Sequence, residues 1–306
     1  MTNHIPVMLD ETVKSLKIIK NGCYVDATFG SGGHSTEILN NLGPNGKLFS
    51  LDKDHDAITI DNPLKNDKRF TLKHGCFSNL STLTKAWGIH GAVNGILFDL
   101  GVSSYHFDTA DRGFSFSLDS KLDMRFDRNK GQSAFDWLRG ASESELANVI
   151  WKYGEERYSR RIARAIVRAR KSSTIKSTVM LSDIVNKSIP KKDPNKNNAT
   201  RTFQAIRIFI NQELDVLKKA LESSYEILAP EGRLVLITYH SLEDKIIKDF
   251  LVHTSGNLSL PKKLPIKDEF LSKMFNLISK SIKPTANEIE KNRRSRSAKL
   301  SVLEKT

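Results

Sequence analysis

A chain of 306 residues, 39% hydrophobic and 27% charged, has the composition of a globular protein and is long enough for two domains, or for one domain with a large insert. Its two cysteines are too few for a disulfide framework. It has no signal-peptide core and no apolar run near the ~20 residues that span a bilayer. These features predict a cytoplasmic protein without membrane contact. The net charge of +13 favours a polyanionic partner such as nucleic acid.

The first third of the chain alternates strands and helices. We expect strands at 23–27, 47–51, 69–73 and 95–98, separated by helices at 35–41, 56–60 and 80–86. Repeated units of this kind predict an α/β fold with a parallel, doubly wound sheet.

From residue 132 onward the pattern changes to helix after helix. Ser142 and Glu145 form a capping box, a second helix spans 157–171, and 202–228 is helical with a break near Asn211. Strands return at 233–238, 275–279 and 298–303. We therefore predict a sheet domain made of residues 1–131 and 214–306, interrupted by an inserted helical domain of residues 132–213.

A glycine-rich turn follows the first strand, in the segment 24–35 (YVDATFGSGGHS). Open α/β sheets bind ligands at the carboxyl ends of strands, and Gly30, Gly32 and Gly33 let the backbone approach a ligand closely. Ser35 stands where G-x-G-x-x-G needs its third glycine, and Asp26 would repel a phosphate, so the pattern argues against a dinucleotide. The alternative is a turn that binds no ligand.

Acidic residues end the second and fourth strands. Asp52 stands where a carboxylate binds the ribose hydroxyls of an adenosine-type ligand, so together with the glycine loop it predicts a nucleoside-containing cofactor. Asp99 ends the strand beside the first and could accept a hydrogen bond from an exocyclic amine. Either carboxylate could instead only cap its own turn. The long loop after Asp99, which contains His106, is typical of a lid over a substrate.

The fifth strand ends in Tyr239 and His240. Ser241 then looks like a helix N-cap with Asp244 as its partner, which leaves Tyr239 and His240 at the crevice edge, able to contact a base. A serine hydrolase is disfavoured because the G-x-S-x-G motif is absent. No metal is expected, since the histidines are scattered without metal-ligand spacing.

Arginines recur on one face of the helix at 157–171. They are Arg157, Arg160, Arg161, Arg164 and Arg168. The positive charge continues at Lys187, Lys191, Lys192, Lys196 and Arg201, and a second basic cluster at 293–299 includes Arg296. Such a stripe predicts salt-sensitive contact with RNA or DNA. The alternative is a solvated face paired with Glu155 and Glu156.

A series of short motifs occurs in order along the chain. They are 4–7 (HIPV), 26–35 (DATFGSGGHS), 99–104 (DLGVSS), 112–116 (RGFSF), 122–125 (LDMR), 153–157 (YGEER), 160–166 (RRIARAI), 200–204 (TRTFQ), 240–244 (HSLED) and 296–300 (RSAKL). This set closely resembles, nearly end to end, the bacterial 16S ribosomal RNA small subunit methyltransferase H (MraW) family. The resemblance implies an S-adenosylmethionine-dependent enzyme that methylates N4 of one cytidine in the decoding region of 16S rRNA. It also implies a class I, Rossmann-like methyltransferase sheet with an inserted helical domain that recognises RNA.

The resemblance also implies the cofactor contacts. Within the glycine loop, the predicted contacts are Gly32, Gly33 and His34, in addition to Gly30. Outside the loop they are Asp52, Phe77 and Asp99. His106 stands where the family usually has a glutamine that contacts the cofactor, and it can still donate a hydrogen bond. S-adenosylmethionine is a sulfonium ligand and carries no phosphate. Its binding is therefore compatible with Ser35 in place of a third glycine and with the negative charge of Asp26.

A mechanism follows as a hypothesis. The cytosine must swing out of its stack, and an acceptor for the N4 hydrogen would aim the nitrogen lone pair at the methyl carbon. The candidate acceptors are Asp99 and the backbone carbonyls of the loop that follows it. The candidate catalytic residues are therefore Asp99 and, in that loop, Ser103 and Ser104. The residues expected to contact RNA are Tyr239, His240, Arg157, Arg160, Arg161, Arg164 and Arg296.

Three other functions stay open at this point. A nicotinamide oxidoreductase also pairs a glycine loop with an acid, and the charge would suit a non-catalytic RNA-binding assembly protein. A DNA amino-methyltransferase usually has prolines after the fourth-strand acid, where this chain has Leu100 and Gly101. The expected partner is 16S rRNA, within the small ribosomal subunit, and the oligomeric state is open, with a homodimer as one option.

Overall fold

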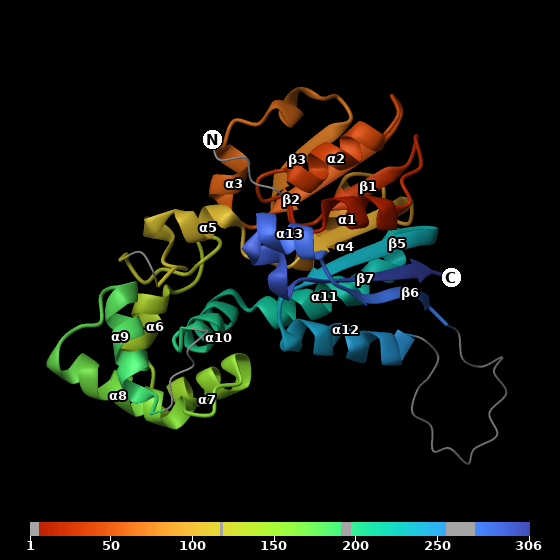
Figure 1. Ribbon diagram of the computed structural model, residues 1–306. Helices are drawn as coiled ribbons and strands as arrows, with labels where there is room; N and C mark the ends of the chain where they lie inside the picture. Colours follow the sequence, from red (N-terminus) through yellow and green to blue (C-terminus); the bar gives the residue numbers. More distant parts are fainter. Residues whose placement is uncertain (1–5, 117–118, 191–196, 255–272) are drawn as a thin grey trace, which may run out of the picture. The chain divides into compact units, whose positions relative to one another are not determined.

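The computed structural model describes residues 6–116, 119–190, 197–254 and 273–306 (Figure 1). Four residues named above, His4, Lys191, Lys192 and Lys196, lie outside the described residues. The chain forms two compact units, one made of Met1–Gly101 with Leu214–Thr306 and the other of Val102–Glu213. We call them the sheet unit and the helical unit. Within the described part of the chain, no helix combines the length and apolar character needed to cross a membrane.

A mixed seven-stranded sheet forms the centre of the sheet unit. Its strands are β1 (Cys23–Asp26), β2 (Lys47–Asp52), β3 (Phe70–His74), β4 (Val93–Asp99), β5 (Leu228–Thr238), β6 (Phe275–Ile282) and β7 (Lys299–Lys305). Their order is β3-β2-β1-β4-β5-β7-β6, and β7 runs antiparallel to both of its neighbours. This is the class I methyltransferase sheet, so the expected fold class is confirmed.

Helices cover both faces of the sheet. Those of the sheet unit are α1 (Leu9–Leu16), α2 (Gly33–Asn41), α3 (His55–Thr59), α4 (Leu80–Ala86), α11 (Glu213–Ile227), α12 (Ser241–Thr254) and α13 (Ala286–Lys291), with 3₁₀ turns at Pro63–Asn66, Phe77–Asn79 and Arg293–Ser297. One apolar core joins α1 and α2 to the sheet through residues such as Leu16 and Ile38. The other core joins α4, α11 and α12 to the opposite face. The central strands are therefore buried on both sides, as their near-continuous apolar runs predict.

The helical unit packs around a core of its own. Its helices are α5 (Ser104–Asp108), α6 (Ala134–Gly140), α7 (Glu143–Gly154), α8 (Ser159–Ser172), α9 (Thr178–Ser188) and α10 (Thr200–Asn211), with a 3₁₀ turn at Ala110–Arg112. The Ser142 hydroxyl accepts a hydrogen bond from the Glu145 N–H, so Ser142 is confirmed as an N-cap, while the Glu145 carboxylate accepts from Nε1 of Trp137 (2.8 Å). The break near Asn211 is confirmed as well, because Gln212 has a left-handed backbone with φ of 53° between α10 and α11.

The helical unit begins at Val102, whereas the sequence predicts its first residue at 132. The difference arises because the segment before α6 packs with the helices, where Leu122 and Met124 are fully buried in their core. Asn211, at the end of α10, holds this segment by its side chain. Its amide donates to the Met124 carbonyl (2.7 Å) and accepts from the Phe126 N–H (2.8 Å). We call this arrangement the Asn211 clasp.

Candidate functional site

The glycine loop lies between the end of β1 and the start of α2. Gly30 and Gly32 have φ of 54° and 82°, a backbone that side chains rarely adopt. A Cβ on Gly32 would lie 2.8 Å from the Phe29 ring, and one on Gly33 would lie 2.2 Å from Cγ of Pro6. Glycine is therefore favoured at Gly30 by the turn, at Gly33 by the surrounding atoms, and at Gly32 by both.

Asp26, at the end of β1, is an internal brace of this loop, with only 1% of its surface exposed. Its carboxylate accepts hydrogen bonds from the Ser35 hydroxyl (2.7 Å) and the Thr28 N–H (3.1 Å). Burial raises the pKa of Asp26, opposed by His34 and by these two hydrogen bonds. Ser35 therefore has a role of its own in this loop, because it binds the carboxylate that ends β1.

Asp52, at the end of β2, reaches the same loop. One carboxylate oxygen accepts from the Gly30 N–H (2.7 Å), and the other accepts from the Asp54 N–H (2.8 Å). The side chain is half-buried. Each carboxylate oxygen can accept more than one hydrogen bond, so Asp52 can fix the loop and also accept from a ligand hydroxyl.

Asp99 lies at the end of β4 with 22% of its side chain exposed, among three groups from other parts of the sheet unit. Its Oδ1 accepts from the Tyr239 hydroxyl (2.8 Å), and its Oδ2 is 3.9 Å from Nδ1 of His34. The backbone N–H of Asp99 donates to Oγ1 of Thr28 (2.8 Å). These contacts orient the carboxylate and join the ends of β1, β4 and β5.

His34 and Tyr239 are themselves constrained. Nε2 of His34 lies 3.0 Å from the Val7 carbonyl, which can only accept, so this nitrogen carries the proton. Burial and the Asp99 carboxylate raise the pKa of Tyr239 well above its usual value, which keeps its hydroxyl a donor at neutral pH. The structure thus places the Tyr239 hydroxyl on Asp99, whereas the sequence predicts contact with an RNA base.

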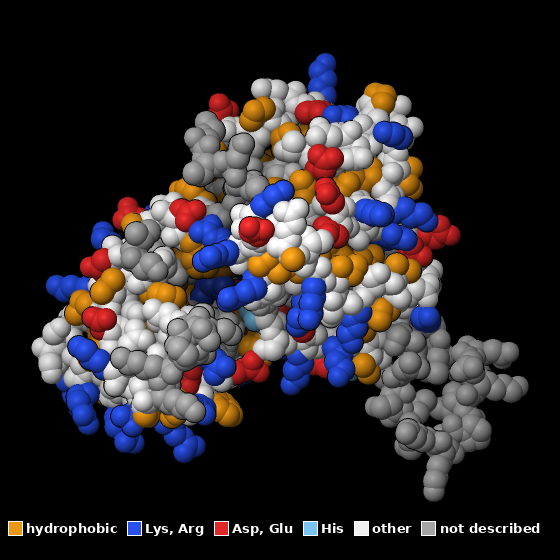
Figure 2. Space-filling model, viewed as in Figure 1, with side chains coloured by type: hydrophobic (Ala, Val, Ile, Leu, Met, Phe, Trp, Pro, Cys, Tyr) orange, Lys and Arg blue, Asp and Glu red, His pale blue; other side chains and the backbone are white. Residues whose placement is uncertain are grey.

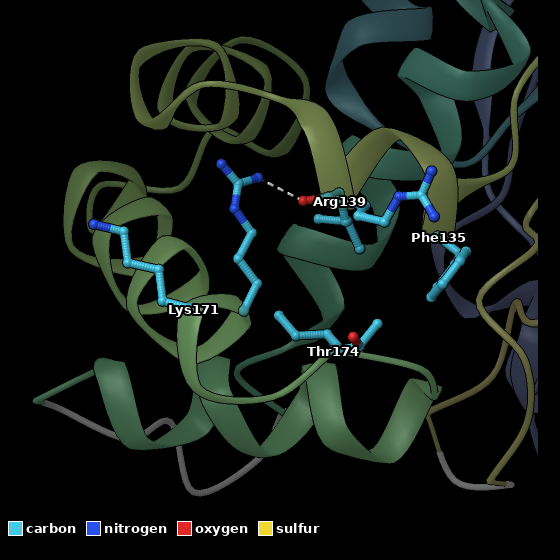
Figure 3. Close-up of a pocket in the computed structure, with 7 residues that line it drawn as sticks. Phe135, Arg139, Lys171 and Thr174 are labelled. Atoms are coloured by element: carbon cyan, nitrogen blue, oxygen red, sulfur yellow. Dashed lines mark hydrogen bonds between the residues drawn. The ribbon is translucent and has the colours of Figure 1, made fainter.

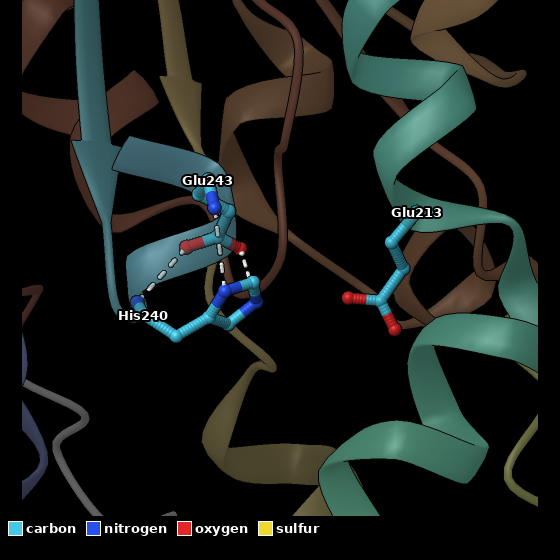
Figure 4. A group of neighbouring side chains, drawn as sticks. All are labelled: Glu213, His240 and Glu243. Carbon is cyan, nitrogen blue, oxygen red and sulfur yellow. Dashed lines mark hydrogen bonds and ion pairs between the residues drawn. The ribbon is translucent and has the colours of Figure 1, made fainter. Parts of the chain in front are cut away.

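His240 lies beside Glu243 at the start of α12 (Figure 4). Its Nε2 is 3.1 Å from one Glu243 oxygen, and the other oxygen accepts from the Tyr239 N–H (2.7 Å). The side chain of His240 is 10% exposed. Asp244, expected as the capping-box partner of Ser241, accepts from Oγ1 of Thr238 (2.7 Å) and from the Lys299 ammonium.

Two side chains at this site were missed by the sequence reasoning. Glu243 binds the backbone at the start of α12, and its position three residues after His240 is a capping-box spacing that could have revealed it. Thr28 accepts from Asp99, and no local pattern signals this contact, because the two residues are 71 positions apart.

Phe77 opens the short 3₁₀ turn after β3. Its half-buried ring meets Phe98 edge-on, with ring centres 5.3 Å apart. This contact belongs to the sheet unit, so core packing accounts for part of the ring's surface. Its predicted stacking near an adenine stays a prediction.

Ser103, Ser104 and His106 belong to the helical unit. Oγ of Ser103 is 2.9 Å from Nδ1 of His106, and Ser104 begins α5. His106 is buried against the rings of Phe114 and Phe126, with ring centres 4.9 and 5.1 Å away. The structure therefore brings Asp26, Asp52 and Asp99 together with the glycine loop, whereas Ser103 and His106 lie in the other unit, with His106 in an aromatic cluster there.

Four arginines of α8, together with Arg157 just before it, form an exposed row. Every predicted member, Arg157, Arg160, Arg161, Arg164 and Arg168, is exposed, and we call the set the arginine stripe. Ile162, Ala163 and Ile166 occupy the buried face of the helix. In Figure 2 blue side chains project along the outer edge of the helical unit, where α7 and α8 lie.

Arg164 of this row has an acidic neighbour. Nε of Arg164 is 3.5 Å from Glu143, but both side chains are exposed, so the pair contributes little. Glu156, one of the two acids expected to pair with the stripe, is buried and lies 3.9 Å from Arg201 instead. Arg296, in the 3₁₀ turn before β7, is exposed on the sheet unit.

Comparison with known proteins agrees with this site. The model of the MraW methylase family matches residues 1–306. Two proteins named ribosomal RNA small subunit methyltransferase H are close relatives. The protein from Coxiella burnetii (strain RSA 331 / Henzerling II) is 47% identical, and the match covers 100% of this chain and 99% of the relative. The protein from Buchnera aphidicola subsp. Acyrthosiphon pisum (strain APS) is 48% identical, and the match covers 98% of this chain and 97% of the relative. Among solved structures, a putative rRNA-methylase from Clostridium thermocellum covers 99% of this chain and 100% of its own at a TM-score of 0.45 and 14% identity, a likeness too remote to bear on function. With a match over its whole length and relatives at nearly half identity, the chain belongs to the MraW methylase family.

Proposed function

We propose that this protein transfers the methyl group of S-adenosylmethionine to N4 of a cytidine in 16S rRNA. The observation that carries the proposal is the full-length identity of 47% to ribosomal RNA small subunit methyltransferase H. The site agrees with it, because Asp52 and Asp99 end two strands beside a glycine loop that contains no phosphate-binding third glycine. A DNA amino-methyltransferase and a nicotinamide oxidoreductase are not supported by any observation of equal weight.

The cofactor would lie along the glycine loop. Gly30, Gly32 and Gly33 give this loop a backbone shape that residues with side chains would strain or block, since a side chain there would collide with protein atoms or strain the turn. Asp52 would accept from the ribose hydroxyls, and Phe77 would contact the adenine. S-adenosylmethionine supplies an electrophilic methyl group on a positively charged sulfur.

Asp99 has the properties that the nitrogen nucleophile requires. The N4 lone pair of cytosine is delocalised into the ring, so an acceptor for the N4 hydrogen must turn it toward the methyl group. The Tyr239 hydroxyl holds Oδ1 of Asp99, while the 22% exposure of the side chain lets a substrate amine approach. Alignment of amine and methyl group would provide most of the acceleration. The proton on nitrogen can leave after transfer, so no strong base is needed.

The helical unit would bind the RNA. The exposed arginine stripe supports this, because phosphate contacts by arginine are strong and bidentate, and its ion pair between Arg164 and Glu143 is exposed and therefore weak. We propose that the substrate is the rRNA within the small ribosomal subunit. The reaction would then take place in the cytoplasm, where bacterial subunits are assembled.

A methylation assay tests the proposal. The protein is incubated with labelled S-adenosylmethionine and undermethylated small subunits, and the modified base is mapped by mass spectrometry. We expect label on N4 of one cytidine, and we expect Asp99→Ala to bind RNA normally while methyl transfer falls by roughly 100-fold or more, as for loss of a positioned acid–base group. RNA binding without any methyl incorporation by the wild-type chain would instead identify an assembly protein. Wild-type turnover in Asp99→Ala would refute the role of Asp99.

A further inference from the structure

A cavity of about 230 Å³ opens on the helical unit (Figure 3). It is lined by Phe135, Leu138 and Arg139 of α6, by Arg170 and Lys171 at the end of α8, and by Thr174 and Ile175 ahead of α9. We call it the α6–α8 pocket. All of its lining residues lie within one unit, and none of them has a role in the function proposed above.

The floor and walls of this pocket are rigid. Leu138 and Ile175 are buried in the core of the helical unit. Nη1 of Arg170 donates to the Leu138 carbonyl (2.6 Å), one of the last carbonyls of α6, which lack partners inside their own helix. This bond, drawn in Figure 3, ties the end of α8 to α6. The pocket is therefore held in shape by the unit itself.

The lining combines apolar and cationic groups. Phe135 is half-buried, and the Arg139 guanidinium lies 6.0 Å from the centre of its ring. Arg139 and Lys171 are exposed at the rim, and together with Arg170 they place three cations around the cavity. Among the described residues that line it, none is acidic. An occupant must therefore offer a flat apolar surface together with negative charge.

We propose that the α6–α8 pocket binds one unstacked nucleotide of single-stranded RNA, with its base against Phe135 and its phosphate near Lys171. Proteins read single-stranded RNA by stacking bases on aromatic rings and on guanidinium groups, and both kinds of surface are present here. The volume is below the about 300 Å³ at which pockets for drug-sized ligands begin, which suits a single base. The inference rests on the proposed function, since it takes RNA as the partner of the helical unit.

The position of the pocket supports the same occupant. Arg170 and Lys171 follow Arg168, the last member of the arginine stripe, on the same helix. A strand of RNA whose phosphates contact the stripe would thus reach the pocket at the end of α8. The stripe would hold the backbone without regard to sequence, and the pocket would require an unpaired base.

Photo-crosslinking of the full-length chain tests this inference. The probe is a short single-stranded RNA that carries 4-thiouridine, and the crosslinked peptides are identified by mass spectrometry. We expect crosslinks in the peptides that contain Phe135 or Ile175. Crosslinks confined to other peptides would overturn the inference.

Affinity measurements on two variants separate base from phosphate. Phe135→Leu keeps the apolar volume that packs on the core but removes the ring, so binding of the probe should weaken about fivefold or more, with an unchanged salt dependence. Lys171→Ala should weaken binding and reduce the slope of log K against log salt by about 0.7, the value of one phosphate on a single strand. Lys218→Ala, which removes an exposed lysine of α11, is the charge-matched control and should change neither quantity.

Three results would refute the inference. Unchanged affinity in Phe135→Leu would exclude a base in the pocket, and equal competition by double-stranded RNA would show that no unpaired base is needed. Displacement of the probe by polyglutamate at equal affinity would identify a site for acidic protein. Methylation of small subunits by the wild-type chain is measured in parallel, so failure of the pocket can be told apart from failure of the proposed function.

Discussion

Replacing Ser35 by alanine tests whether the buried carboxylate of Asp26 stabilises the glycine loop. The Ser35 hydroxyl donates to Asp26 at 2.7 Å and lies 2.9 Å from the hydroxyl of Ser50, and all three side chains are buried. A hydrogen bond to a charged group contributes about 1.5–3 kcal/mol, against about 0.5–1.5 kcal/mol for a neutral pair. We expect Ser35→Ala to lower the free energy of unfolding by about 2 kcal/mol when Asp26 is ionised.

The loss should depend on pH. Because the pKa of Asp26 is raised in the folded state, the folded protein holds its proton more firmly than the unfolded chain. Stability from this group is therefore greatest below the ordinary aspartate pKa of about 4 and falls as pH rises toward the folded value. Ser35 opposes that fall by binding the ionised form. The destabilisation by Ser35→Ala should thus be about 1 kcal/mol larger at alkaline pH, where Asp26 is ionised, than near the ordinary aspartate pKa of about 4, where the folded protein keeps the proton.

Urea unfolding at the two pH values measures this difference. The control is Ser224→Ala, because the Ser224 hydroxyl is equally buried but donates to the backbone carbonyl of Leu221 (2.6 Å), which does not titrate. Its loss should be about 1 kcal/mol at both pH values. Equal, pH-independent losses in Ser35→Ala and Ser224→Ala would refute the reasoning, because Ser35 would then not sense the charge of Asp26.

Further outcomes are expected from the same structure. Replacing Arg160, Arg161 and Arg164 by alanine should weaken RNA binding and reduce its salt dependence. Each lost phosphate contact reduces the slope of log K against log salt by about 0.7–0.9. An unchanged slope would reject the stripe as an RNA-binding face. Asp52→Ala should raise the Kd for S-adenosylhomocysteine in calorimetry by about 10-fold or more, because a charge-assisted hydrogen bond to ribose and the anchor of the loop are lost together. Tyr239→Phe should lower kcat by about 10-fold with little change in RNA affinity. A lower RNA affinity with an unchanged kcat would instead favour contact of Tyr239 with the RNA.

The acidic ends of the strands could be predicted from sequence because they depend on local patterns. Each of Asp26, Asp52 and Asp99 follows an apolar run, and parallel strands bring their carboxyl ends to one edge of the sheet. The N-cap at Ser142 could also be predicted from sequence, since Ser142 and Glu145 lie in one turn. For such features, the period of the apolar residues and the helix-start residues carry enough information.

Contacts between distant residues could not be predicted in this way. Tyr239 and Asp99 are 140 positions apart, and their hydrogen bond exists only because β4 and β5 are neighbours in the sheet. The first border of the helical unit was missed for a similar reason, because the segment around Met124 has no helical period and is assigned to its unit by packing alone. The short helix α13 also gave no apolar signal, and none of its residues is buried.

The Asn211 clasp has a consequence for the order in which the chain folds. β4 and β5 are parallel neighbours, yet the whole helical unit lies between them in sequence, so their pairing must close a long loop. Once Asn211 binds the backbone at Met124 and Phe126, that loop shortens from about 130 residues to about 40, which lowers its closure cost by about 1 kcal/mol. The helical unit therefore assists completion of the sheet, and the cofactor site of the enzyme forms more readily after the helical unit has folded.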